Sequence, residues 1–155
     1  TFGLITAAQA AHWFRLDAFY REVRRVAAPG ALLALVSYGV LQLEEELQSR
    51  FLQFYLHEIG PFWPAARRLV DNGYRDIDFP FSEVAIPALT IRYAWPLESL
   101  LGYISTWSAV TRAREAGRED IFAQFCTDMA GLWGDETQLR PVSWPVTVRA
   151  GRVES

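Results

Sequence analysis

The chain has 155 residues, of which 51% are hydrophobic and 21% charged, and its formal net charge at pH 7 is -3. This composition is typical of a compact globular protein and excludes a disordered chain. It also lacks the excess of positive charge that attracts a nucleic-acid backbone. No apolar stretch reaches the roughly 18 residues that cross a bilayer, and no signal peptide opens the chain, so we expect a cytoplasmic protein with no nucleic-acid or membrane partner.

The beginning of the chain predicts a strand, a helix and a second strand. Residues 2–6 are a short apolar run with β-branched side chains, followed by small residues. We expect a helix capped by Asp17 to follow and to stop at Pro29 and Gly30. Residues 31–37 are apolar almost throughout, as in a parallel strand covered on both faces. Together these elements predict a βαβ unit.

The remainder predicts helices followed by strands. Residues 41–74 have the pattern of two helices joined by the aromatic corner "GPFWP". Residues 87–95 alternate as a strand does, and a helix then extends from Pro96 to about Gly117. A second helix is expected over residues 119–133. Alternating apolar residues near the C-terminal end predict a last strand.

Four stretches of the sequence carry a resemblance to a known family. They read "FGLITAAQAAHWF", "LDAFYREVRRVAAPGALLALVSYG", "GPFWPAARRLVDNGYRDIDFPF" and "LLGYISTWSAV". In this order they resemble the C-terminal part of small-molecule class I methyltransferases that depend on S-adenosylmethionine, and within that family the trans-aconitate-methyltransferase-like group. The most specific feature is "AAQAAHWF" followed one helix later by "EVRRVAAPGALL".

The resemblance implies an α/β fold, the C-terminal half of a doubly wound, Rossmann-like methyltransferase sheet with inserted lid helices. Residues 2–6 would be its fourth strand and residues 31–37 its fifth. Residues 84–95 and 142–149 would be the last two strands, the final one antiparallel.

The resemblance also bears on domain organisation. It implies a single domain over residues 1–155 with a helical insertion at about 41–74. The glycine-rich turn and the acidic residue with which the family holds its cofactor belong to strands that this sequence lacks, and no GxGxG occurs in it. We therefore expect the N-terminal, cofactor-binding half to be absent from this chain, and the chain alone to be inactive.

The loop after the first strand is the expected cofactor site. Ligands of open α/β sheets bind beyond the carboxyl ends of the strands. The resemblance therefore implies that Thr6, Ala7, Gln9 and Trp13 contact S-adenosylmethionine. Two interpretations of Trp13 stay open, a cation–π contact with the sulfonium or packing in the core. Two interpretations of Gln9 also stay open. It binds polar atoms of the cofactor or the substrate, or it is a surface residue at the start of a helix.

His12 is the candidate catalytic residue, because it is the only residue of this loop with an ordinary pKa near neutrality. A phenol or alcohol acceptor benefits from a base, whereas a carboxylate is already a nucleophile. The other interpretation gives His12 a structural hydrogen bond.

We expect no metal site, because His57 has no partner at ligand spacing. The single cysteine, Cys126, excludes a disulfide within the chain.

Substrate-binding residues are expected in and around the inserted helices. The resemblance implies that Tyr38, Tyr55, Trp63 and Trp107 form the wall of the substrate pocket, although core packing is the alternative for each. As a set they suit a flat, apolar or aromatic substrate. Arg67 is the candidate to clamp a substrate carboxylate, with a solvated surface position as its alternative.

We therefore expect S-adenosylmethionine-dependent methyl transfer to a small carboxylic acid or phenol-like acceptor, with this chain as the substrate-facing half. The alternative is a non-catalytic interaction module. Its exposed, apolar fourth strand would pair with a second copy of the chain, giving a homodimer through the sheet edge.

Overall fold

The structure is a computed structural model that describes residues 1–154. The chain folds into two compact units. The first comprises Thr1–Val40, Ala66–Ile91 and Trp144–Ser155, and the second comprises Leu41–Ala65 and Arg92–Ser143. The second unit therefore also contains residues outside the helical insertion expected at about 41–74. The expectation of a single domain over residues 1–155 stays a prediction.

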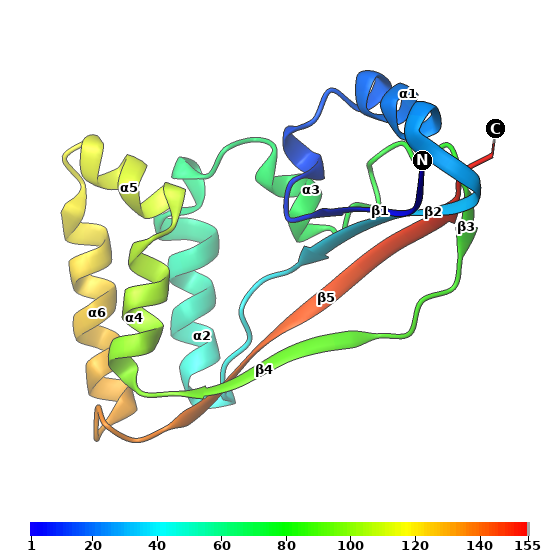
Figure 1. The fold of residues 1–155 in the computed structure, drawn as a ribbon. Helices are drawn as coiled ribbons and strands as arrows, with labels where there is room; N and C mark the ends of the chain where they lie inside the picture. The colour runs from blue at the N-terminus through cyan, green and yellow to red at the C-terminus, as the bar shows by residue number, and fades with distance from the viewer. Residues whose placement is uncertain (155) are drawn as a thin grey trace. The chain divides into compact units, whose positions relative to one another are not determined.

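A βαβ unit opens the first unit, as predicted (Figure 1). Strand β1 (Phe2–Ala8) pairs in parallel with β2 (Ala27–Tyr38), and helix α1 (Leu16–Val26) connects them. The register places Leu4 opposite Leu32 and continues to the end of β1. Both strands are longer than expected, but their order and direction are confirmed.

The sheet is mixed, with the order β1-β2-β5-β3. Strand β5 (Arg140–Arg152) is antiparallel to β2, as predicted for the last strand. Strand β3 (Ser82–Val84) pairs with the other side of β5 and is also antiparallel, and β4 (Leu89–Trp95) pairs with β5 as well. The expected strand over residues 84–95 is thus two strands, separated by a segment that contains Pro87, which cannot donate to a ladder. β1 lies at the edge of the sheet.

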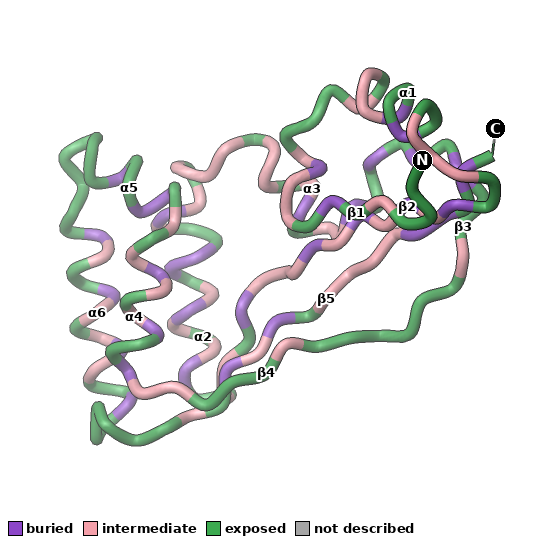
Figure 2. The backbone as a smooth tube through the Cα atoms, viewed as in Figure 1, coloured by how far each residue is buried: buried purple, intermediate pink, exposed green. Residues whose placement is uncertain are grey.

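The core of the first unit lies on the side of β2 that faces α1. Ala31, Leu33 and Leu35 alternate along β2 and are buried, because successive side chains of a strand point to opposite faces. They cluster with the buried side chains of α1 and of the segment before β3, which are Tyr20, Val23, Val70, Tyr74, Ile77, Phe79 and Phe81. Figure 2 shows the buried positions along β2.

Both predicted ends of α1 need correction. The residue before the helix is Arg15, with no side-chain cap, and Asp17 instead lies in the first turn, where its charge favours the helix dipole. The helix ends at Val26, and β2 already includes Pro29 and Gly30. The physical reason is that a residue before proline is restricted to extended conformations, so the strand begins ahead of Pro29.

The second unit is helical. Its long helices are α2 (Glu45–Gln53), α4 (Leu97–Ser105), α5 (Ser108–Glu115) and α6 (Glu119–Trp133), with a π-helical turn η2 (Phe54–Glu58) and a 3-10 turn η3 (Gly60–Phe62) after α2. Helices α2, α4 and α5 all contact α6. The rings of Phe54 and Phe125 stack between η2 and α6, with centroids 4.0 Å apart. The predicted bounds of α6 are confirmed.

The second helix of the 41–74 segment, α3 (Arg67–Asp71), is short and belongs to the first unit.

The helix expected from Pro96 to Gly117 is interrupted. It divides into α4 and α5 at Thr106 and Trp107, and Trp107 has an extended backbone with ψ 140°. The hydroxyls of Ser105 and Thr106 donate to the carbonyls of Gly102 and Tyr103 at 2.6 and 2.7 Å. Such bonds from side chain to backbone compete with regular helix geometry, so the helix ends here.

Leu33→Ala tests the core of the first unit. Leu33 is fully buried, so the substitution is expected to lower the free energy of unfolding by about 2–5 kcal/mol through lost burial and a cavity. The matched control is Leu4→Ala, because Leu4 lies on the neighbouring strand but is 59% exposed, and a change within about 0.5 kcal/mol is expected. Urea unfolding followed by circular dichroism measures both. Equal effects of the two substitutions would contradict the assignment of the core.

Candidate functional site

Gln9 holds the loop after β1 against the end of β2 by hydrogen bonds. The backbone N–H of Gln9 donates to the carbonyl of Val36 at 2.7 Å. Its side-chain oxygen accepts from the backbone N–H of Tyr38 at 3.0 Å, and its side-chain nitrogen donates to the carbonyl of Tyr38 at 3.5 Å. Both polar atoms of the amide therefore bind Tyr38. Contact of Gln9 with a cofactor remains a prediction. For the Gln9 side chain to bind a cofactor, one of its two hydrogen bonds to Tyr38 would have to break.

Thr6 and Ala7 lie at the carboxyl end of β1, as predicted, but they differ in exposure. Thr6 is exposed, whereas Ala7 is buried in the core. Ala7 can therefore offer a ligand only its backbone. Tyr38 is half-buried at the corresponding end of β2.

His12 lies in a 3-10 turn, η1 (Ala11–Trp13), that follows this loop. Its Nδ1 is 3.2 Å from the hydroxyl of Tyr74, a residue 62 positions along the chain. Tyr74 is fully buried and has a φ of 60°, which is unusual for a residue with a side chain. The preceding Gly73 also has a positive φ, of 67°. This pair turns the chain after α3 and brings the phenol to His12.

The pair is neutral near pH 7. Burial lowers the pKa of His12 from its ordinary value of 6.5, and the positive charge of Arg67 lowers this pKa further. Burial also raises the pKa of Tyr74 above 10.0, while backbone hydrogen bonds from Ala11 and His12 and the charge of Arg67 oppose this rise. An uncharged imidazole and an uncharged phenol thus lie beside a cationic side chain.

Arg67 belongs to the same unit as His12 and is not simply a solvated residue. Its Nε donates to Oδ1 of Asp71 at 3.1 Å across one turn of α3. The neighbouring Arg68 is exposed. The charge of Arg67 therefore acts close to His12, although Asp71 already binds part of its guanidinium.

Trp13 does not pack in the core. Its side chain is 63% exposed, and its ring centroid is 4.8 Å from that of His12. Phe14 is 38% exposed and packs against Phe19 with centroids 4.7 Å apart. Of the two interpretations of Trp13, core packing is contradicted, and contact with a ligand stays a prediction.

Three of the predicted substrate residues form an aromatic cluster in the second unit. The ring centroids of Tyr55 and Trp63 are 5.4 Å apart, those of Tyr55 and Trp107 are 5.7 Å apart, and those of Trp63 and Trp107 are 5.4 Å apart. Tyr103 joins them at 5.6 Å from Trp107. Tyr55 is buried and the two tryptophans are half-buried. The interruption between α4 and α5 places Trp107 in this cluster.

The predicted site residues thus form two groups. His12, Trp13, Arg67 and Tyr38 belong to the first unit, and the aromatic cluster belongs to the second. The sequence analysis missed Tyr74 and Tyr103. Tyr103 lies four residues before Trp107, a spacing that would place both on one face of the single helix expected there, whereas no spacing rule links Tyr74 to His12.

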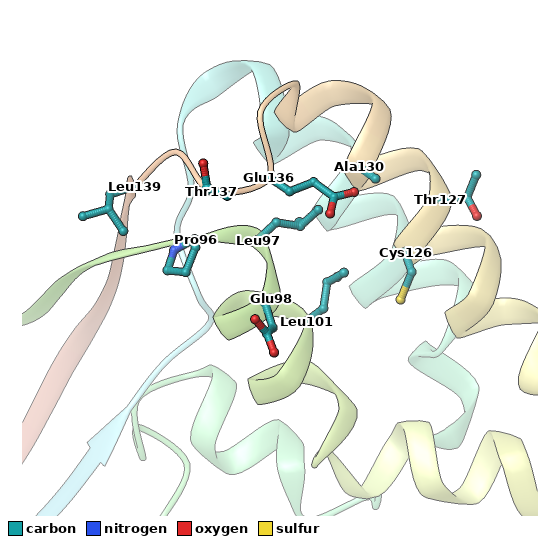
Figure 3. Close-up of a pocket in the computed structure, with 10 residues that line it drawn as sticks. All are labelled: Pro96, Leu97, Glu98, Leu101, Cys126, Thr127, Ala130, Glu136, Thr137 and Leu139. Atoms are coloured by element: carbon teal, nitrogen blue, oxygen red, sulfur yellow. The ribbon is translucent and has the colours of Figure 1, made fainter.

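The second unit also has a pocket of about 680 Å³ between α4 and α6, which contains none of the predicted site residues (Figure 3). Leu97 and Leu101 of α4 and Cys126 of α6 line it, with the carboxylates of Glu98 and Glu136. Burial raises the pKa of the Cys126 thiol, so this thiol stays protonated and weakly nucleophilic.

Residues 1–154 contain neither a metal-binding cluster of side chains nor a membrane-spanning helix. No group of three or more histidine, cysteine, aspartate or glutamate side chains there could hold a metal ion. No helix in the same part of the chain has both the length and the apolar character to cross a membrane.

Comparisons with known proteins show what this chain is similar to. No family model matches the chain. A Dictyostelium discoideum protein named "putative methyltransferase" is 30% identical over 149 residues, which are 92% of this chain and 57% of that protein. A solved structure from Anaeromyxobacter dehalogenans, described as a "putative type II methyltransferase", is 41% identical and superposes with a TM-score of 0.87, covering 97% of this chain and 64% of that one.

The chain is related to methyltransferases. The resemblance predicted from the sequence is confirmed at this level, and the mixed sheet with helices agrees with the C-terminal half of the methyltransferase fold. The trans-aconitate group stays a prediction. The chain spans less than two thirds of the length of either methyltransferase relative.

Two substitutions of Gln9 test whether its hydrogen bonds to Tyr38 stabilise the loop. Gln9→Ala removes both side-chain bonds to Tyr38 and is expected to lower the free energy of unfolding by about 1–2 kcal/mol. Gln9→Gly removes the same bonds but relieves the strain of a φ of 51°, so it should be more stable than Gln9→Ala by about 1 kcal/mol. Urea unfolding measures both. A glycine variant less stable than the alanine variant would contradict the left-handed conformation.

Proposed function

We propose that this chain is the acceptor-facing half of an S-adenosylmethionine-dependent methyltransferase of the cytoplasm that acts on a small carboxylic acid or phenol. The observation that carries the proposal is the group at the carboxyl end of β1, where His12 and the exposed Trp13 lie beside the charge of Arg67. Ligands of open α/β sheets bind at this edge. The relatedness to methyltransferases supports the reaction class.

The residues of the loop fit the methyl-bearing end of the proposed cofactor. S-adenosylmethionine supplies a methyl group on a positively charged sulfur. The exposed face of Trp13 suits such a cation, and the exposed hydroxyl of Thr6 is available for a hydrogen bond. Residues that would hold the adenosine belong, in this proposal, to the N-terminal half of the longer protein.

In methyl transfer the protein mainly has to align the acceptor with the methyl group of the donor. Methyl transfer is an in-line displacement, so a well-oriented acceptor in a dry site reacts without extensive acid–base machinery. Arg67 would attract a carboxylate acceptor, and His12 would contact it. The substrate roles of Tyr55, Trp63 and Trp107, which belong to the second unit, stay a prediction.

His12→Ala tests the proposed function in a methyltransferase that contains this segment. With a labelled methyl donor and a panel of small carboxylic acids and phenols, we expect methylated product, and the substitution should lower kcat/KM on the order of 10²-fold by removing a polar contact to the acceptor. His57→Ala is the control, because His57 is exposed and belongs to the other unit. Unchanged kcat/KM in the His12 variant, or equal losses in both variants, would contradict the assignment.

A second candidate function, self-association, is favoured by one observation. Phe2 and Leu4 of the edge strand β1 are 60% and 59% exposed, whereas Ile5 and Ala7 pack in the core. An edge strand with exposed apolar side chains and unpaired backbone groups invites pairing with another chain. The partner in this proposal is a second copy of the chain.

Leu4→Lys tests self-association. If β1 pairs with a second copy, the chain should have the mass of a dimer, and the substitution should reduce it to that of a monomer by placing charge on the edge. Leu56→Lys is the matched control, because Leu56 is 56% exposed in the second unit, and this variant should remain a dimer. Light scattering after gel filtration measures the masses. A monomeric parent chain would exclude this candidate.

A further inference from the structure

The pocket between α4 and α6 combines apolar surface with two carboxylates. Its volume of about 680 Å³ lies within the range of pockets that bind small molecules, roughly 300–1,000 Å³. Leu97, Leu101 and Leu139 give it hydrocarbon surface, and Glu98 and Glu136 add their carboxylates (Figure 3). All of these residues belong to the second unit, so the pocket lies within one compact unit.

No basic side chain balances the two carboxylates inside the pocket. Among residues 1–154, those that line it include neither an arginine nor a histidine. Arg140 is the arginine nearest to Glu136 along the chain, but it binds the carboxylates of Glu44 and Glu46 and the carbonyl of Trp133. The pocket therefore presents negative charge beside apolar surface.

The helix ends at the pocket also favour a positive charge. The last turn of α6 contributes Ala130 to the pocket and contains no basic residue. The carbonyl end of a helix carries a partial negative charge that a cation offsets. At the start of α4, Glu98 lies in the first turn, where its charge offsets the positive end of that helix. A cation in the pocket would thus be attracted, whereas an anion would not.

We propose that this pocket binds a small molecule that carries a protonated amine on an apolar body. The amine would pair with Glu98 or Glu136, to which it can donate up to three hydrogen bonds. The apolar body would cover the leucine side chains and remove them from water. A metal ion is a poorer occupant, because no group of three or more metal-ligating side chains occurs in residues 1–154.

The inference does not rest on the proposed function. None of the residues predicted to bind S-adenosylmethionine or the methyl acceptor is among the described residues that line this pocket. An amine bound here would be a further ligand of the protein. Failure of this inference and failure of the proposed methyl transfer are therefore separate results.

An NMR titration of this chain with hexylamine tests the site without a methyl donor. The pKa of an alkylamine is close to that of lysine, about 10.4, so hexylamine is protonated at neutral pH. We expect saturable shifts of the backbone amide signals of Leu101, Ala130 and Thr137, which line the pocket. Hexanol has the same chain without the charge and should bind about fivefold more weakly. Hexanoate, which is negatively charged, should bind more weakly than hexanol.

Three outcomes of the titration would overturn the inference. The first is the absence of saturable binding. The second is a set of shifts that leaves the amide signals of the pocket residues unchanged. The third is equal binding of hexylamine and hexanol, because the pocket would then recognise the apolar chain and not the charge.

Substitutions of the two glutamates test the charge from the side of the protein. Glu98→Gln and Glu136→Gln each remove a charge at nearly constant size, and each should weaken hexylamine binding about three- to fivefold while leaving hexanol binding unchanged. Glu115→Gln is the matched control, because Glu115 is an exposed residue of α5 in the same unit and is not among the lining residues. Its affinity for hexylamine should not change. Equal losses in all three variants, or unchanged affinity in both pocket variants, would overturn the inference.

Discussion

Parallel pairing of β1 with β2 aligns the carboxyl ends of the two strands, and the candidate site is built on that alignment. The ladder ends where Gln9 leaves the strand with a positive φ, and the side chain of Gln9 then binds the backbone of Tyr38 at both polar atoms. This connection determines where the loop begins and hence where η1 lies. The position of His12 therefore depends on backbone pairing between strands.

Contacts distant in sequence complete the site. The chain turns at Gly73 and Tyr74, both with positive φ, and the phenol of Tyr74 reaches the imidazole of His12. Burial and the charge of Arg67 keep that imidazole uncharged by lowering its pKa.

The second unit contributes a different property. Its aromatic side chains gather because η2, η3 and the interruption between α4 and α5 each place one ring in the same cluster. Tyr55, Trp63 and Trp107 have edge-on or tilted contacts, which aromatic rings favour over face-to-face stacking.

The sequence by itself determined the βαβ unit, the antiparallel last strand, the bounds of α6 and the relation to methyltransferases. The βαβ unit and the bounds of α6 follow from hydrophobic periodicity, which acts over a few residues. The antiparallel direction of the last strand and the relation to methyltransferases follow from the resemblance carried by motifs such as "AAQAAHWF". Tertiary structure decided the rest. It ended α1 before Pro29, divided the helix at Trp107 and exposed Trp13. It also paired His12 with Tyr74, because a bond between residues 62 positions apart depends on how the chain turns in space, which no local pattern encodes.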